Sequence, residues 1–365
     1  MISDIHAISG NTLFDLIIIG AGPAGLAASL EARRMNWRVA IIERASEPGG
    51  KTAQYTCKAD EQCRQCGTCQ VCDAIAAVEA DPDIELFLSV TATRCTQVNT
   101  AYHVSLRSKT TPEIPPVIRT RRLLLATGFK PFDPALKPAL GYGRFRNVIS
   151  LENLEPHLKS AGNLEPFLLP YPSPAGTAET RTVSAAFIQC VGSRDETASA
   201  NYCSQVCCRT ALRLARLMID QALISDATVF YTDLQTLDSG TRNLALDTAS
   251  LSLICGLPAE VTRDPDGRLR LRYETDQSNT LLETVFDLVV LAGGIRPVQP
   301  LSDMTGLEDL TTDLHGFWQV SAAASHADIL AVAGTASGPM DILSAMAHGR
   351  YAVRAMAMAP RDLTS

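Results

Sequence analysis

Cysteines dominate the residues of this chain that could carry out chemistry. The 365 residues include eleven cysteines, and most of them fall in two short segments. The first segment holds Cys57, Cys63, Cys66, Cys69 and Cys72. The second holds Cys190, Cys203, Cys207 and Cys208. No signal peptide is recognisable, and reducing compartments disfavour structural disulfides. So many thiols therefore predict metal or redox chemistry.

The first segment has the spacing C-x5-C-x2-C-x2-C-x2-C. Closely spaced thiolates of this kind hold a cubane iron–sulfur cluster in bacterial ferredoxins. Zinc is a competing metal, but zinc knuckles are usually about a dozen or more residues apart, and here no gap separates them. A thiol/disulfide pair is the third alternative. A cluster has four ligand positions, so at least one of the five cysteines would not be a ligand. The spacing does not identify which one.

The second segment has the spacing C-x12-C-x3-C-C and opens a helix expected over residues 210–222. Cys203 and Cys207 are one helical turn apart, and Cys208 flanks them. Amides at a helix N-terminus favour thiolates, which suits metal or redox chemistry. The alternative is that buried cysteines act as small core residues, which is the expectation for the isolated Cys95 and Cys255.

A dinucleotide-binding pattern opens the scaffold that must position these thiols. Residues 14–28 combine an apolar strand with Gly-x-Gly-x-x-Gly, formed by Gly20, Gly22 and Gly25. Gly20 suits the tight turn, Gly22 lets backbone approach a pyrophosphate, and Gly25 permits close helix packing. A second strand ends in Glu43, 18 residues after Gly25, where a ribose hydroxyl finds its acceptor. The alternative is a strand–helix turn that binds no ligand.

Three later segments resemble flavin-binding turns of the thioredoxin and glutathione reductase class. They are residues 49–52, the Ala-Thr-Gly end of the strand at 122–128, and the Gly-Thr end of the strand at 329–335. That class usually has Asp in place of Thr335, and Asp341 is the candidate to compensate. The predicted cofactor-binding residues are Gly20, Gly22, Pro23, Ala24, Gly25, Glu43, Arg44, Gly49, Gly50, Lys51, Thr52, Ala126, Thr127, Gly128, Gly334, Thr335 and Asp341.

The fold expected is α/β, with two Rossmann-like dinucleotide-binding domains as in the thioredoxin/glutathione reductase class. Residues 1–150 and 285–365 are expected to form a discontinuous FAD-binding domain that includes the Cys-rich loop 57–72. Residues 151–284 are expected to form the second domain, entered through a Pro- and Gly-rich crossing at 155–182. Where the class carries its NAD(P)H motif, residues 189–194 have one glycine in place of three. Nicotinamide binding is therefore not expected there.

Composition excludes several function classes. The formal net charge of −7 argues against non-specific nucleic-acid binding. No apolar run approaches the roughly 20 residues of a membrane span, so we expect a cytoplasmic protein. No Ser/His/Asp set or carboxylate pair is recognisable, and none of the six histidines is predicted to be catalytic. Catalytic side chains are therefore not assigned.

In their order along the chain, these motifs resemble the A-type subunit of heterodisulfide reductase, most specifically in residues 187–195 and 202–208. The resemblance covers most of the chain. Methanogen forms of that protein carry an extra N-terminal domain and inserted ferredoxin modules, which are not seen here. The short form resembles the corresponding component of the heterodisulfide-reductase-like complex of sulfur-oxidising bacteria. A related flavoprotein belongs to the membrane-associated quinone-interacting oxidoreductase of sulfate reducers.

This resemblance implies non-covalent FAD and a [4Fe-4S] cluster, held by the first cysteine set, the second, or both. It implies an electron-transfer subunit that connects two-electron with one-electron steps in sulfur metabolism, with other subunits of the complex as partners. We expect a homodimer when the chain is isolated. Two alternatives stay open: an NAD(P)H-dependent disulfide reductase with Cys66 and Cys69 as its dithiol, and a structural subunit with zinc and FAD.

Overall fold

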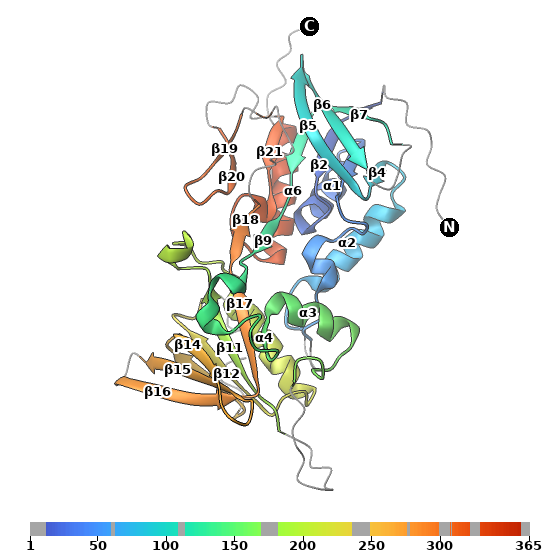
Figure 1. The fold of residues 1–365 in the computed structure, drawn as a ribbon. Coiled ribbons are helices and arrows are strands. Elements are labelled where there is room, and N and C mark those ends of the chain that lie inside the picture. Colours follow the sequence, from blue (N-terminus) through green and yellow to red (C-terminus); the bar gives the residue numbers. More distant parts are fainter. Residues whose placement is uncertain are drawn as a thin grey trace. The chain divides into compact units, whose positions relative to one another are not determined.

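The computed structural model describes residues 12–59, 63–108, 114–168, 182–235, 249–275, 278–298, 307, 309–321 and 329–358. The chain forms two compact units, each visible in Figure 1. The first consists of Met1–Ala53, Gly67–Lys130 and Pro297–Ser365. The second consists of Gln54–Cys66 and Pro131–Arg296. Each unit is described by itself below.

The first unit is built on a five-stranded parallel sheet with the order β21-β8-β2-β3-β4. These strands are β2 (Leu16–Ile19), β3 (Val39–Ile42), β4 (Ile84–Phe87), β8 (Leu123–Leu125) and β21 (Leu330–Val332). The residues of β2, β3 and β8 are all buried. A parallel sheet covered on both faces explains why these segments are continuous apolar runs without alternation.

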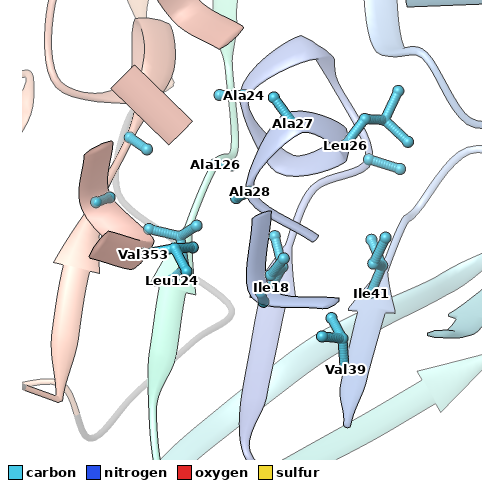
Figure 2. Close-up of a cluster of buried hydrophobic side chains, with 14 of the residues drawn as sticks. Ile18, Ala24, Leu26, Ala27, Ala28, Val39, Ile41, Leu124, Ala126 and Val353 are labelled. Atoms are coloured by element: carbon cyan, nitrogen blue, oxygen red, sulfur yellow. The ribbon is translucent and has the colours of Figure 1, made fainter. Parts of the chain in front are cut away.

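Helices cover one face of this sheet: α1 (Pro23–Arg34), α2 (Thr68–Ala80) and α6 (Ile342–Met358). Figure 2 shows small and aliphatic side chains of α1, such as Ala24, Ala27 and Ala28, packed with Leu124 and Val353. A Cβ at Gly349 of α6 would lie 2.1 Å from the carbonyl oxygen of Ala24. The two helices therefore approach each other closely because this position has no side chain.

A mostly antiparallel sheet covers the other face. Its order is β1-β7-β6-β5, from β1 (Leu13–Phe14), β5 (Val90–Val98), β6 (Ala101–Ser108) and β7 (Val117–Thr120). Ile17 and Ile19 of β2 pack there against Val104 and Ile118. A small hairpin in the same unit pairs β19 (Leu310–Thr312) with β20 (Trp318–Val320). The parallel sheet is thus the middle of three layers.

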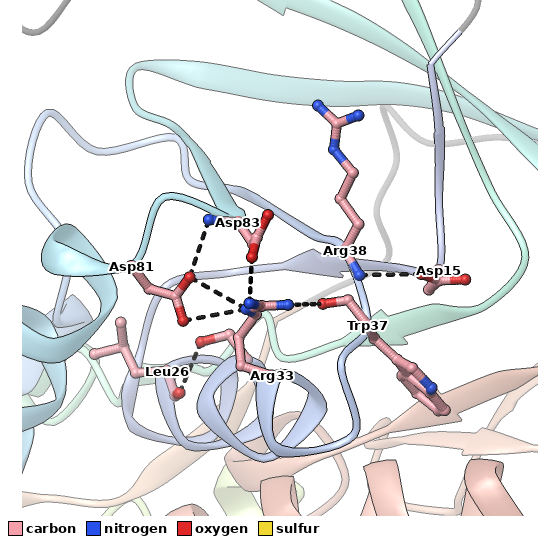
Figure 3. Close-up of polar contacts among 8 residues, drawn as sticks. Asp15, Leu26, Arg33, Trp37, Arg38, Asp81 and Asp83 are labelled. Carbon is pink, nitrogen blue, oxygen red and sulfur yellow. Dashed lines mark hydrogen bonds and ion pairs between the residues drawn. The ribbon is translucent and has the colours of Figure 1, made fainter.

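Arg33 fastens the end of α1 to the strands beside it (Figure 3). Its Nε lies 3.1 Å from both carboxylate oxygens of Asp81, and it forms a second ion pair with Asp83. Its Nη1 also donates to the carbonyl of Trp37 at 2.8 Å. This network fixes the position of α1, and therefore of the helix start that a dinucleotide would meet.

The second unit repeats the three-layer architecture. Its parallel sheet has the order β10-β17-β11-β12-β13, from β10 (Val148–Ser150), β11 (Ser184–Val191), β12 (Asp226–Tyr231), β13 (Leu251–Cys255) and β17 (Leu288–Gly293). Helices α3 (Leu151–Ser160) and α4 (Cys207–Asp220) cover one face. The other face carries an antiparallel sheet of β14 (Glu260–Arg263), β15 (Leu269–Thr275) and β16 (Ser278–Phe286).

The units divide the chain at other places than the sequence suggests. The strand at 288–293 was expected in the FAD-binding domain, but β17 pairs with β10 and β11 of the second unit. Residues 151–160 of the expected crossing region form α3, while 169–181 lie outside the described residues. The chain passes between units at β9 (Phe129–Pro131) and β18 (Ile295–Pro297), and between residues 53 and 67.

Short 3-10 helices complete the described secondary structure. They are η1 (Gly50–Gln54), η2 (Pro134–Leu136), η3 (Pro138–Leu140), η4 (Glu196–Ala198) and η5 (Gly334–Ala336). Among the described residues, no helix has both the length and the apolar character that a membrane span requires.

Candidate functional site

The turn between β2 and α1 is shaped by two glycines that contact backbone. Gly20 has φ +110°, and a Cβ there would lie 2.3 Å from the carbonyl oxygen of Ala126. A Cβ at Gly25 would lie 1.9 Å from the carbonyl oxygen of Gly20. Any side chain at either position would collide with backbone atoms, which cannot move aside without a large energetic cost. Gly20 and Gly25 therefore shape the turn itself, as the sequence predicts.

Gly22 differs because its Cβ position faces open space. Nothing lies within 4 Å of a Cβ built there, and its φ of −77° suits any residue. Gly49 donates its N–H to Ala21 at 2.7 Å, which brings the Gly49–Gly50 turn beside this opening. The Oγ1 of Thr127 is buried and has no hydrogen-bond partner among the described residues. An open approach and an unsatisfied hydroxyl fit a bound dinucleotide.

Glu43 is buried at the end of β3 and accepts two backbone hydrogen bonds. Its Oε2 accepts from Ala21 at 2.8 Å, and its Oε1 accepts from Ala45 at 2.9 Å. Each carboxylate oxygen has a further lone pair, so acceptor capacity for a ribose hydroxyl remains. Of the neighbouring predicted residues, Arg44 is exposed and Thr52 is buried.

Asp341 and Gly334 occupy the start of the α6 region. Asp341 Oδ1 accepts the N–H of Ser344 at 2.8 Å, so this carboxylate caps the first turn of α6. Gly334 lies against Ala24 of α1, since a Cβ there would come 2.6 Å from the Ala24 methyl. The N–H of Gly334 donates to Nδ1 of His348 at 3.3 Å, and burial lowers the pKa of that imidazole. No sequence motif marks His348.

The first cysteine set is divided between the units. Cys57, Cys63 and Cys66 belong to the second unit, whereas Cys69 and Cys72 lie in the first turns of α2 in the first unit. Cys66 is partly exposed and the other four are exposed. The chain's described residues contain no group of three or more Cys, His, Asp or Glu in a metal-binding arrangement.

A buried ion pair fastens the segment that carries Cys57. Lys58 Nζ lies 2.8 Å from the carboxylate of Glu155 on α3, and the two side chains are only 4% and 3% exposed. Lys58 also donates to the carbonyl of Thr56 at 3.2 Å. Burial raises the pKa of Glu155, and Lys58 opposes that shift. Sequence reasoning missed this pair, because Lys58 and Glu155 are far apart in the chain.

The second cysteine set gathers at one edge of the second unit's sheet. Cys190 lies at the end of β11, and Cys207 and Cys208 are the first two residues of α4. With Cys203, these make four thiols that interact electrostatically. Burial raises the pKa of Cys190 to about 11 and raises those of Cys207 and Cys208 as well. Thiols so desolvated form thiolates only beside a strong positive charge, which a bound metal cluster would supply.

Positive charge and backbone amides already face these sulfurs. The guanidinium of Arg194 favours the thiolate of Cys190, lowering its pKa against the effect of burial. Sγ of Cys203 accepts the N–H of Gln205 at 3.2 Å. The first turn of α4 has no side-chain cap, so its amides are available to negative charge. The electrostatics of this edge suit thiolates.

The loop before α4 holds Cys203 in a fixed place. The hydroxyl of Ser193 and the N–H of Arg194 both donate to the carbonyl of Tyr202, at 3.1 and 3.0 Å. The Tyr202 hydroxyl donates to Ile295 at 2.8 Å, and buried Ser204 accepts the N–H of Ile295 at 2.8 Å. The residues flanking Cys203 are thus tied to the sheet.

At this edge of the second unit's sheet, Gly192 leaves no space for a pyrophosphate to approach the backbone. A Cβ at Gly192 would lie 2.1 Å from the ring of Phe132, so this glycine is packed against an aromatic side chain. Asp233, two residues after β12, forms an ion pair with Arg194. A pocket of about 380 Å³ opens beside Cys190 and Arg194. The packed glycine is the feature that bears on the absence of nicotinamide binding, which stays a prediction.

Known proteins resemble this chain both in sequence and in fold. Residues 14–164 match the family model of the pyridine nucleotide-disulphide oxidoreductases. The thioredoxin reductase of Lactococcus lactis superposes with a TM-score of 0.61 at 16% identity, covering 94% of this chain and 98% of the other. That of T. acidophilum has a TM-score of 0.59 at 13% identity, covering 94% and 97%. The predicted α/β reductase fold is therefore confirmed.

Curated relatives carry the name predicted from the motifs. The A-type subunit of the H(2)/formate:CoB-CoM heterodisulfide,ferredoxin reductase of Methanococcus maripaludis is 32% identical over 250 residues. The A-type iron-sulfur subunit of the CoB–CoM heterodisulfide reductase of Methanocaldococcus jannaschii is 32% identical over 259 residues. Each match covers 66% of this chain and 37% of the relative, so the chain spans little more than a third of these relatives. The predicted resemblance and the oxidoreductase class are confirmed, and flavin binding is supported.

Proposed function

We propose that this chain, a relative of the A-type subunit of heterodisulfide reductase, is an FAD- and [4Fe-4S]-containing electron-transfer subunit of a heterodisulfide-reductase-like complex. One observation carries the proposal. Two units of the same architecture differ at the edge where Rossmann-like sheets bind ligands. The first has open space at Gly22, whereas the second has a filled glycine and buried thiols. One unit thus suits a dinucleotide and the other suits a metal cluster.

In the first unit, the residues around α1 would bind and orient FAD. The open side of Gly22 admits the pyrophosphate, where amides at the helix start favour its charge. Glu43 would accept a ribose hydroxyl while its two backbone hydrogen bonds hold the carboxylate still. The buried hydroxyl of Thr127 would gain the partner that it lacks among the described residues.

In the second unit, Cys190, Cys203, Cys207 and Cys208 would hold the cluster. Cys207 and Cys208 are buried, which would limit the access of water, and Arg194 would offset part of the negative charge that four thiolates bring. A bound flavin exchanges electrons in pairs or singly and a cluster exchanges one, so together they connect two-electron with one-electron chemistry. The relative from M. jannaschii is named an iron-sulfur subunit, which supports this assignment. The exposed run of Cys57 to Cys72 is a second candidate for metal binding.

Partner subunits are part of this proposal. No catalytic side chain is assigned, so substrate sulfur chemistry would occur on partner subunits, in the cytoplasm. The names of the relatives include a subunit designation, which supports partners of the same kind. In isolation the chain would form a homodimer. Sulfur metabolism is the process that the resemblance favours, with a quinone-interacting oxidoreductase as the alternative setting.

Cofactor content tests this proposal. The chain would be purified anaerobically, and its FAD, iron, acid-labile sulfide and zinc would be counted before and after reduction, with EPR spectra. We expect about four iron and four sulfide atoms for each FAD, and an EPR signal on reduction. Zinc without sulfide, or the absence of flavin, would overturn it.

A further inference from the structure

Gln189 is buried with an unsatisfied carboxamide. The residue is only 1% exposed, and both Nε2 and Oε1 have no hydrogen-bond partner within the described part of the chain. Burying a polar group without a hydrogen-bond partner destabilises the folded state. An apolar residue of similar size would avoid that cost. Gln189 is therefore expected to have a partner beyond the described protein atoms.

A β-bulge determines which way Gln189 points. Ile188 pairs with Leu291 and Val191 with Gly293, so β11 has one more residue than β17 between these pairs. Ile188 and Val191 both pack on the face covered by the antiparallel sheet. The two residues between them, Gln189 and Cys190, must therefore turn to the other face. That face is covered by α3 and α4.

The start of α4 lies on this face beside Cys190. The thiol of Cys207 accepts a hydrogen bond from the backbone N–H of Cys190. Cys190 itself has φ +56°, a left-handed conformation that is unfavourable for residues other than glycine. The bulge thus brings Gln189 and Cys190 together to the side where the buried thiols gather.

We propose that the carboxamide of Gln189 donates N–H···S hydrogen bonds to the cluster held by the second cysteine set and raises its reduction potential. This rests on the proposed function. Reduction adds one negative charge to the cluster, and a donor to sulfur stabilises the more negative state. The amide N–H₂ has two donors and meets no acceptor among the described residues. Sulfur atoms of a cluster would accept the hydrogen bonds that these donors lack.

The test compares Gln189→Met with a matched control, Asn147→Leu. Methionine has nearly the same size and no donor. Asn147 is also a 1% exposed amide of the second unit, but it precedes β10 at the opposite edge of the sheet and donates to Asp287 at 2.8 Å. Iron, sulfide and FAD would be counted, and the cluster midpoint would be measured by EPR-monitored redox titration.

We expect Gln189→Met to keep its iron and shift the midpoint to a more negative value. At the wild-type midpoint the ratio of oxidised to reduced cluster would rise about tenfold, which for one electron is about 59 mV. Asn147→Leu should leave the midpoint unchanged. An unchanged midpoint in Gln189→Met, or an equal shift in Asn147→Leu, would overturn the inference.

Two arms keep the inference testable. If Gln189→Met does not retain iron, Gln189→Leu decides, because it also removes both amide donors and introduces no charge. A midpoint below the wild-type value supports the hydrogen bond, and an equal or higher one contradicts it. Failure of the proposed function is distinguishable, since wild-type protein would then contain no iron or sulfide.

Discussion

Phe132 lies against Gly192 so closely that a Cβ on the glycine would come within 2.1 Å of its ring. At Gly22 of the first unit, by contrast, a Cβ would have nothing within 4 Å. A glycine that follows a buried parallel strand can therefore serve two different purposes. At Gly22 it leaves space for a ligand, and at Gly192 it makes space for an aromatic side chain.

The filled position at Gly192 predicts poor reduction by nicotinamide. NADH or NADPH should reduce the flavin of the isolated chain slowly or not at all, because Phe132 and the Arg194–Asp233 ion pair occupy the edge of the second sheet. Anaerobic stopped-flow mixing, followed at the flavin absorbance, measures the rate. Reduction at enzyme-like rates of about 10 per second or faster would contradict this prediction and favour the alternative that the chain is an NAD(P)H-dependent disulfide reductase.

Gly22→Val should produce folded protein without FAD. The free space at Gly22 and its φ of −77° accept a side chain, so the valine would meet only the bound pyrophosphate. Flavin content after purification and circular dichroism would be measured together. Gly25→Val is the control for misfolding, since its side chain would strike the backbone of Gly20. Stoichiometric flavin in the Gly22→Val variant would contradict the assignment of this turn as an FAD-binding site.

Lys58→Met should destabilise the chain by about 3–5 kcal/mol, because it leaves the buried carboxylate of Glu155 without its cation. The double variant Lys58→Met, Glu155→Leu should recover most of that loss, since both charges are then gone. Urea unfolding followed by circular dichroism gives these values. Arg270→Met, which removes an exposed partner of Glu283, should change stability by at most about 1 kcal/mol. Equal effects of the Lys58 and Arg270 changes would contradict the burial argument.

We expect flavin retention to depend on pH through the imidazole of His348. Burial lowers its pKa, so the folded chain favours the neutral imidazole that accepts the N–H of Gly334. Unfolded histidine titrates near about 6.5, so the folded state binds fewer protons. The stabilisation is complete above that pH and is lost as pH falls through about 6.5 towards the lower folded pKa.

Wild-type protein should therefore release FAD more readily at about pH 5.5 than at about pH 7.5. His348→Gln keeps an acceptor but does not titrate in this range, so its retention should vary less with pH. His103→Gln on β6 is the control and should behave like wild type. FAD remaining after gel filtration at each pH measures the effect. An identical pH profile for His348→Gln and wild type would exclude this histidine as the cause.

Local patterns predicted much of the architecture. The strand, glycines and following helix at residues 16–34 were readable because a buried parallel strand and a tight turn each require particular residue types. Unit boundaries were less readable. The strand at 288–293 has the same apolar character as the strand at 123–125, and pairing partners decide to which sheet each belongs. Pairing is a long-range property that a single sequence does not reveal.

The candidate site was partly visible in the sequence. The spacing of Cys203, Cys207 and Cys208 indicated that they start a helix, and α4 does begin at Cys207. The spacing of the first set suggested a local cluster loop, yet its cysteines are divided between two units. Gln189 and His348 were not identified, because their importance comes from a bulge and from a distant glycine. Ordinary residues acquire such roles only through tertiary contacts.

Iron content in two double cysteine variants tests most directly where the cluster lies. Cys203→Ala, Cys207→Ala removes one partly exposed and one buried thiol of the second set, and Cys66→Ala, Cys69→Ala removes two thiols of the first. After anaerobic purification, iron, sulfide and the EPR signal of the reduced protein would be measured relative to FAD. We expect the Cys203/Cys207 variant to lose iron and signal, and the Cys66/Cys69 variant to keep both. Loss confined to the Cys66/Cys69 variant, or full iron and an unchanged signal in both, would contradict a cluster in the second unit.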